Sequence, residues 1–342
     1  MLRFLSSLFS DVPQTPGGPD RHLVEAAVER VVDATDPRLR GFGDYRKRLF
    51  AGAERSLVHV QALIDSLPEP VEMGGRTFGS DPRLRAFFAS PGRLRELIAN
   101  APSVIDLLAK KGPRPQNIFG LLAPQMKERE VLGMELQGDQ LRRDVLQRVV
   151  DFSDHRFVGA SGSEAEARDE LKKRAFDFLA ELALRRILDM KERKTGLEQQ
   201  QRLLQRKLDA MQAGNWGLEP MLAADGDRHS DYGALEQKVE AVEGELMGQP
   251  CSGEGLEAHF NCINAVLEQP GEWLSLRGVE LNIDVMSLRV EDPAAAGSSE
   301  PLRLTEMLAS NAPRRIVLFG YLPSTELPPE RDLLEESRRI LG

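Results

Sequence analysis

The chain has 342 residues, of which 41% are hydrophobic, 29% charged and 6% aromatic, and its formal net charge at pH 7 is −9. A chain of this length builds one large or two ordinary domains with hydrophobic cores, and no apolar run reaches the roughly 18 residues that span a bilayer. Two cysteines, Cys251 and Cys262, are too few for a disulfide framework. The composition therefore predicts a globular protein of the cytoplasm.

The charge is distributed unevenly along the chain. Residues 1–213 carry 35 Lys and Arg against 31 Asp and Glu, whereas residues 214–342 carry 10 against 23. An acidic C-terminal part repels nucleic acid and attracts the basic-leaning first part. A nucleic acid is therefore a less favoured partner than a protein.

Residues 1–20 are predicted to be an amphipathic segment followed by a linker. Residues 11–20 are rich in Pro and Gly, and residues 1–10 place Leu2, Phe4, Leu5, Leu8 and Phe9 on an apolar stripe with one cation, Arg3. Such a stripe can lie in a membrane interface, although one Arg gives little attraction to anionic lipid. Peripheral membrane contact through residues 1–10 stays open beside a disordered or core-docked terminus.

The pentapeptide Asp-Pro-Arg-Leu-Arg occurs twice, at residues 36–40 and 81–85. Asp is a good N-cap, and Pro suits the first helical position, whose N–H has no partner within the helix. The two copies share little beyond the pentapeptide, which argues against a tandem repeat, and no nucleic-acid motif surrounds the arginines. The pentapeptide therefore predicts two helix starts.

Residues 21–162 are predicted to form a helical domain with short strands. Apolar residues spaced by three and four follow Asp36 and predict a helix up to Pro68, irregular near Gly41 and Gly43. Ser90-Pro91 and Ala101-Pro102 start two further short helices. Alternating apolar residues predict a strand at 130–136, while the pattern over 140–158 fits both a helix and a strand.

Residues 163–248 carry the longest helical pattern of the chain. Ser163 and Glu166 form a capping box, and apolar residues then alternate at spacings of four and three up to Met211, as in a heptad seam. After a loop at 214–233 the heptad resumes with Leu235, Val239, Val242 and Leu246. We expect an antiparallel coiled-coil hairpin in which Leu208 lies near Val239.

Residues 249–342 are predicted to form a small α+β domain. A helix is expected at 255–268, alternating residues predict a strand at 279–285, and the apolar run 314–323 is typical of a buried strand. A last amphipathic helix is expected from Pro329 to Leu341.

A search for catalytic motifs finds no phosphate-binding glycine loop, zincin helix, EF-hand loop or nucleophile elbow. The nearest candidate is Gly-Ala-Ser-Gly-Ser at 159–163, which has Ser where the elbow needs its second Gly and follows Asp154 and His155. We interpret Ser161 and Ser163 as the start of the following helix, so no catalytic residue is assigned.

Three residues raise the question of a metal site, namely Cys251, His259 and Cys262, with His229 upstream. Zinc sites need four such ligands with tighter paired spacing, and a small core residue is the favoured interpretation of Cys262. We assign no metal or cofactor, and metal binding by the three residues stays open.

Eight cations lie between Arg185 and Lys207, with acids interleaved. They suit a nucleic-acid groove or a solvated coiled-coil surface, but pairing with the acidic segment 234–247 explains them more economically. In that pairing, Arg202, Arg206 and Lys207 would lie beside Glu240 and Glu243.

Taken together, the patterns predict a mainly α fold with an N-terminal helical bundle, a central antiparallel coiled-coil hairpin and a small C-terminal α+β unit. A long amphipathic element without a catalytic constellation favours a protein-protein interaction or scaffold protein acting through the hairpin. The alternatives are an enzyme whose site is assembled from scattered residues and a nucleic-acid or membrane-surface binding protein. The first helix of the hairpin is much longer than the second, so its 164–196 half needs another partner. Homo-oligomerisation would supply one from a second chain.

Overall fold

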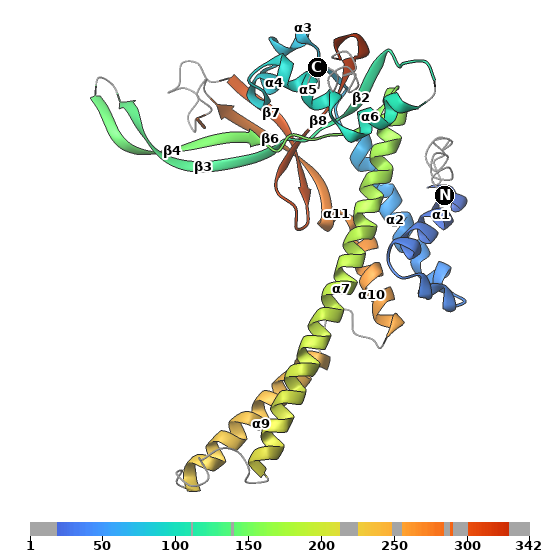
Figure 1. The fold of residues 1–342 in the computed structure, drawn as a ribbon, viewed down its shortest axis with the longest axis vertical. Coiled ribbons are helices and arrows are strands. Elements are labelled where there is room, and N and C mark those ends of the chain that lie inside the picture. The colour runs from blue at the N-terminus through green and yellow to red at the C-terminus, as the bar shows by residue number, and fades with distance from the viewer. Residues whose placement is uncertain are drawn as a thin grey trace, which may run out of the picture. The chain divides into compact units, whose positions relative to one another are not determined.

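Figure 1 shows a computed structural model of the chain, which describes residues 19–110, 112–137, 140–212, 225–247, 255–283, 288–289 and 300–327. Only the backbone is described for residues 134–137, 140–143, 211–212, 225–232, 247 and 300. The chain divides into two compact units: unit 1 takes residues 1–16, 58–175 and 271–342, and unit 2 takes residues 17–57 and 176–270. No helix in the described part is long and apolar enough to cross a membrane. The domain boundaries expected at residues 20, 162 and 248 stay predictions.

The predicted fold class, mainly α with a coiled-coil centre, is wrong. Helices account for 58% of the structure, but strands account for 25% and form one eight-stranded sheet. The sheet belongs to unit 1 and consists of β1 Val71–Glu72, β2 Asn117–Leu122, β3 Gln125–Gln137, β4 Gln140–Ser153, β5 Phe157–Ser161, β6 Leu274–Ile283, β7 Glu300–Ala309 and β8 Arg315–Pro323. All pairings are antiparallel except that of β1 with β8.

The segment 140–158, whose pattern fitted both a helix and a strand, forms β4 and the start of β5, and β4 contains a bulge. Gly133 pairs with Val145 and Met134 pairs with Arg143, so Asp144 is an extra residue in β4. Asp144 has φ +61°, in the left-handed region. One extra residue shifts the side-chain alternation to the other face. Val145, Leu146, Val149 and Val150 all follow the bulge and occupy both faces of β4, so their spacing resembles that of a helix although the backbone is extended.

Strand β8 is the centre of the sheet. Its residues 318–323 pair with β2, its residues 315–317 pair with β7, and Arg315 also pairs with Gln125 of β3. Residues 288–289 bridge to Val149 of β4 and to Ile283 of β6, so the sheet curls until these two outer strands come close. The predicted buried strand at 314–323 is confirmed as β8, and the predicted strand at 130–136 lies within β3.

Three short helices pack their apolar side chains on this sheet: α4 Pro82–Phe87, α5 Pro91–Ala99 and α6 Pro102–Ala109. Each has Pro at its start, and Asp81 and Ser90 cap the first two through their side chains. The helices and strands share one hydrophobic core, which includes Leu84, Leu94, Ile98, Val104, Ile118 and Leu322. The short α3, Gly75–Phe78, comes before them, and the 3-10 helix η2, Ser324–Glu326, follows β8.

Unit 2 is helical. It contains α1 Arg21–Ala34, the 3-10 helix η1 Pro37–Gly41, the first part of α2 Tyr45–Asp65, most of α7 Glu164–Gln212, α9 Asp225–Met247 and α10 Leu256–Leu267. The short helix α11, Pro270–Trp273, lies at the boundary between the units. Arg30 of α1 donates two hydrogen bonds to Asp177 of α7, at 2.7 and 2.6 Å. The helix predicted at 255–268 is confirmed as α10. Residues 1–10 and 329–341 lie outside the described residues.

The repeated pentapeptide starts a helix in both copies, as predicted. In the first copy the Asp36 carboxylate accepts from the backbone N–H of Arg38 at 3.1 Å and from its guanidinium at 2.9 and 2.7 Å. In the second copy Asp81 holds Arg83 in the same way, at 2.8, 3.0 and 2.6 Å. The leucine that follows is fully buried in both. The predicted helix from Asp36 to Pro68 is interrupted where irregularity was expected, near Gly41 and Gly43: η1 ends at Gly41, and α2 extends from Tyr45 to Asp65.

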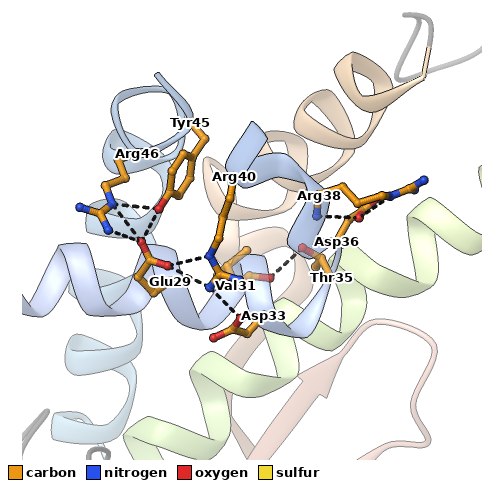
Figure 2. A network of polar contacts seen from close by, with 9 residues as sticks. All are labelled: Glu29, Val31, Asp33, Thr35, Asp36, Arg38, Arg40, Tyr45 and Arg46. Carbon is orange, nitrogen blue, oxygen red and sulfur yellow. Dashed lines mark hydrogen bonds and ion pairs between the residues drawn. The ribbon is translucent and has the colours of Figure 1, made fainter. Parts of the chain in front are cut away.

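Figure 2 shows the polar network that joins α1 to this first copy. Glu29 accepts hydrogen bonds from Tyr45 at 2.6 Å and from Arg46 at 2.9 Å, and Arg40 contacts both Glu29 and Asp33. The arginines of the first copy are therefore bound within the protein, which agrees with their interpretation as structural residues.

Helices α7 and α9 run antiparallel, and their seam contains residues that the heptad pattern selected. Leu208, Leu235 and Val239 form one buried cluster, with Leu204 packed against it. Gln201 donates to Glu243 at 2.9 Å, further from the turn (Figure 1). Contacts between early residues of α7 and late residues of α9 require opposite directions, so the predicted hairpin contact is present.

We expect Asp36→Ala to cost about 2–4 kcal/mol of unfolding free energy and Asp81→Ala about 0.5–2 kcal/mol. Both substitutions remove an N-cap, but Asp36 also accepts a hydrogen bond from His259, and a buried donor left without a partner costs about 1–3 kcal/mol more. Urea unfolding measures both values, with Asp36→Asn as the control that keeps a capping side chain. Equal losses for the two alanine variants would contradict the added contribution of His259, and no loss in either variant would contradict the capping account.

We expect cysteines at positions 208 and 239 to form a disulfide within one chain, because Leu208 and Val239 belong to the same buried cluster. The variants carry Cys251→Ser and Cys262→Ala, and non-reducing electrophoresis after mild oxidation reports the product. Cysteines at 208 and 246 are the matched control, because position 246 is seven residues, or about 10 Å, further along α9. A disulfide found only between chains would show that the helices pair in trans.

Candidate functional site

The structure contains a pocket of about 690 Å³ within unit 1. It lies between the end of α4, the exposed side of α5, the start of α6 and the start of β5. Its apolar wall includes Phe87, Phe88, Leu97, Pro102, Phe157 and Val158. Pockets of about 300–1,000 Å³ with mostly apolar walls and few polar groups are typical of small-molecule sites. This pocket is therefore the candidate functional site of unit 1.

Charged side chains stand at the pocket with an excess of positive charge. Arg93 and Glu96 come from α5, and Arg156 comes from the turn before β5. Arg156 donates to Asp154 at 3.2 Å. Arg93 and Glu96 make no side-chain hydrogen bond or ion pair with the residues that the structure describes. Arg93 and Glu96 are thus one cation and one anion at the pocket that have no ion-pair partner among the described residues.

His155 forms part of the wall and is an aromatic rather than a charged element. Its ring lies on that of Phe88, with centroids 4.4 Å apart and an interplanar angle of 33°. Burial lowers the pKa of His155, although the Phe87 backbone and two nearby aspartates act in the opposite direction. Its Nε2 is buried and has no hydrogen-bond partner among the described residues. The ring is therefore neutral at pH 7.

The residues that resembled a catalytic triad do not assemble into one. The Asp154 carboxylate binds Arg315 and Arg156, and these two guanidinium groups hold the pKa of Asp154 below its usual range. Ser161 is the last residue of β5, so its interpretation as part of the helix start is wrong, and its hydroxyl donates to the Gly159 carbonyl at 3.5 Å. Ser163 is the helix start that the sequence predicted, since its Oγ accepts from the Glu166 N–H at 3.3 Å.

The possible metal ligands are placed apart or in other contacts. Cys251 and the side chain of His229 lie outside the described residues. His259 is bound to Asp36 through Nδ1 at 2.7 Å, and Cys262 is buried with its Sγ 3.8 Å from Sδ of Met190. Within the described ranges no group of three His, Cys, Asp or Glu side chains is arranged to hold a metal ion.

The cations of α7 form a second candidate site. Lys191, Lys194, Arg202 and Arg206 make no ion pair with the described residues, and all four are exposed. The predicted pairing of Arg202 and Arg206 with Glu240 and Glu243 is therefore not formed. We call these four cations the basic stripe, because spacings of three, eight and four place them on one face of the helix.

No known protein family, curated protein or solved structure matches this chain. The two candidate sites therefore rest on the residues themselves. Sequence reasoning missed the pocket because its wall comes from residues 87–102 and 155–158, which only the sheet brings together. The aromatic residues Phe87, Phe88 and Phe157 were the available signal, and their pattern resembles that of ordinary core positions.

The buried pair of His259 and Asp36 predicts a pH dependence of stability. His259 is 3% exposed and Asp36 is 6% exposed. Burial, Lys191 and Arg38 lower the pKa of His259, while Asp36 raises it, and the net shift is downward. The unfolded chain therefore takes up this proton first as the pH falls through 6.5, so stability is present above that pH and is lost below it.

We expect the melting temperature of the wild type to fall more between pH 7.5 and 5.5 than that of His259→Gln, whose amide can still donate to Asp36 but does not titrate. Calorimetry in both buffers measures the difference. His22→Gln, at an exposed position of α1, should keep the wild-type dependence. If His259→Gln loses as much as the wild type, His259 is not neutral in the folded protein.

Proposed function

We propose that the protein is a protein-protein interaction or scaffold protein, that its contact element is the α7–α9 hairpin, and that its partner presents an acidic surface. The basic stripe carries this proposal. Four exposed cations along one helix face have no partner of their own in the described chain, and at about 1.5 Å per residue they extend over roughly 22 Å. We expect this contact to be made in the cytoplasm.

The packing of α7 supports a surface open to a partner. Residues 191–196 are exposed on every side of the helix. A helix that is polar and exposed on all sides is typical of a segment that crosses solvent between other parts of a structure. Leu188 and Leu203 of α7 are 53% and 66% exposed, so apolar area is also available beside the cations.

The described part of the hairpin seam buries few apolar side chains. Leu208, Leu235 and Val239 form one cluster with Leu204 packed against it, and Val242 is also buried. Burying one such side chain contributes about 1.5–3 kcal/mol. A partner that covers Leu203 would enlarge the apolar contact, and acids beside the basic stripe would fix its orientation.

A protein suits the basic stripe better than a nucleic acid does. The neighbouring helix α9 also carries exposed acidic residues, Glu236, Glu240, Glu243 and Glu245. Glu198 lies on the stripe itself. A phosphate backbone would be repelled by these carboxylates, whereas a protein surface can place cations against them. The enzyme alternative has less support, because the pocket combines no acid and base within hydrogen-bond distance among the contacts of the described residues.

The test is a photoreactive amino acid at position 203 of the full chain, produced in the source cell and irradiated there. We expect one discrete protein adduct. The double variant Arg202→Glu/Arg206→Glu should lower its yield severalfold, because an exposed ion pair contributes up to about 1 kcal/mol. Arg193→Glu, exposed on another face of the same helix, is the matched control and should keep the yield. An adduct of twice the chain mass would identify a second copy as the partner.

Three results would contradict the proposal. The first is that the photoreactive amino acid gives no adduct at position 203 but captures a protein when it is placed at the exposed position 105 of α6. The second is an adduct that nuclease treatment removes, which would make the partner a nucleic acid. The third is an equal loss of adduct with Arg193→Glu and with the double variant.

A further inference from the structure

We propose that the pocket of unit 1 binds a small amphipathic anion, an apolar chain or ring that carries one carboxylate. This inference is independent of the hairpin and concerns a free small molecule. It rests on the size of the pocket, on its wall and on the charge at its edge.

The apolar wall of the pocket favours a ligand with an apolar chain or ring. The rings of Phe87, Phe88 and Phe157, together with His155 and Pro102, surround a volume of about 690 Å³. The His155 ring stacks on Phe88 rather than contributing a charge. A hydrocarbon chain or ring placed against these surfaces loses contact with water, which contributes roughly 25 cal/mol per Å² of buried apolar area.

The charged residues at the edge of the pocket favour a ligand with a single negative charge. Arg93 has no partner among the described side chains, whereas the charge of Arg156 is already shared with Asp154 at 3.2 Å. One free guanidinium binds one carboxylate in a bidentate arrangement. Glu96, three residues after Arg93 on α5, opposes a ligand with more negative charge and favours one carboxylate over several.

The direct test uses decanoate as the probe and the intact protein. We expect saturable binding of decanoate at one site per chain by isothermal titration calorimetry. Decyltrimethylammonium, with the same chain and the opposite charge, should bind at least tenfold more weakly. Equal binding of the two probes would show that the pocket only accepts hydrocarbon and would overturn the assignment of an anionic ligand.

Variants at Arg93 and Glu96 test how much the carboxylate contributes to decanoate binding. Arg93→Gln should weaken decanoate binding up to about fivefold, in line with an exposed ion pair, and Glu96→Gln should strengthen it. Arg76→Gln, an exposed arginine of α3 outside the pocket, is the matched control and should change nothing. Equal effects of Arg93→Gln and Arg76→Gln would exclude Arg93 as the residue that binds the carboxylate.

A substitution that fills the pocket tests whether decanoate binds there. Ala89 is exposed and lines the pocket, so Ala89→Trp should fill the space without disturbing the core. We expect loss of decanoate binding with an unchanged melting temperature. Decanoate binding that survives in Ala89→Trp at wild-type affinity would place the ligand elsewhere.

Discussion

The close approach of backbones at Gly320 is the constraint on which the sheet depends. Gly320 of β8 pairs with Val71 of β1 on one side and with Gly120 of β2 on the other. A Cβ at position 320 would clash with the Val71 carbonyl and would lie 2.6 Å from Cε of Met73. A Cβ on Gly120 would lie 2.5 Å from the Phe157 ring. Two facing glycines therefore let β1 join β8 and let a pocket-lining ring lie on β2.

Arg315, the first residue of β8, fixes the turn between β4 and β5, which places His155 and Arg156 at the pocket. Arg315 is buried and donates to the carbonyls of Ala123 and Asp154 at 2.8 and 2.9 Å, and it also binds the Asp154 carboxylate. Ala123 in turn donates to the Arg156 carbonyl at 2.8 Å. Because a buried charge is stable only when it is paired and hydrogen-bonded, this cluster holds His155 and Arg156 where β4 passes into β5. The placing of His155 and Arg156 at the pocket thus depends on the buried contacts of Arg315.

Local signals predicted the parts of the structure that local chemistry determines. The helix starts at Pro82, Pro91 and Pro102, the seam at Leu208 and the apolar run of β8 follow from residues near in sequence. The sheet could not be predicted in this way, because β8 pairs with strands about 200 to 250 residues away. In addition, the apolar residues of β4 lie on both of its faces and lack the alternation of a half-buried strand. The ion pairs expected between α7 and α9 failed for another reason: opposite charges on adjacent helices need side chains that face each other, and net charge does not determine this.

The two proposed sites depend on different forces, and salt separates them. Exposed charges on the basic stripe are screened over about 8 Å at physiological ionic strength, so contact through the hairpin is weakened by added salt. Burial of a hydrocarbon against Phe87, Phe88 and Phe157 is not weakened in this way, because it depends on apolar area removed from water. Only the contribution of Arg93 is screened. The two proposals therefore differ in the response to salt that they predict: binding through the basic stripe of unit 2 should weaken, whereas binding in the pocket of unit 1 should change little.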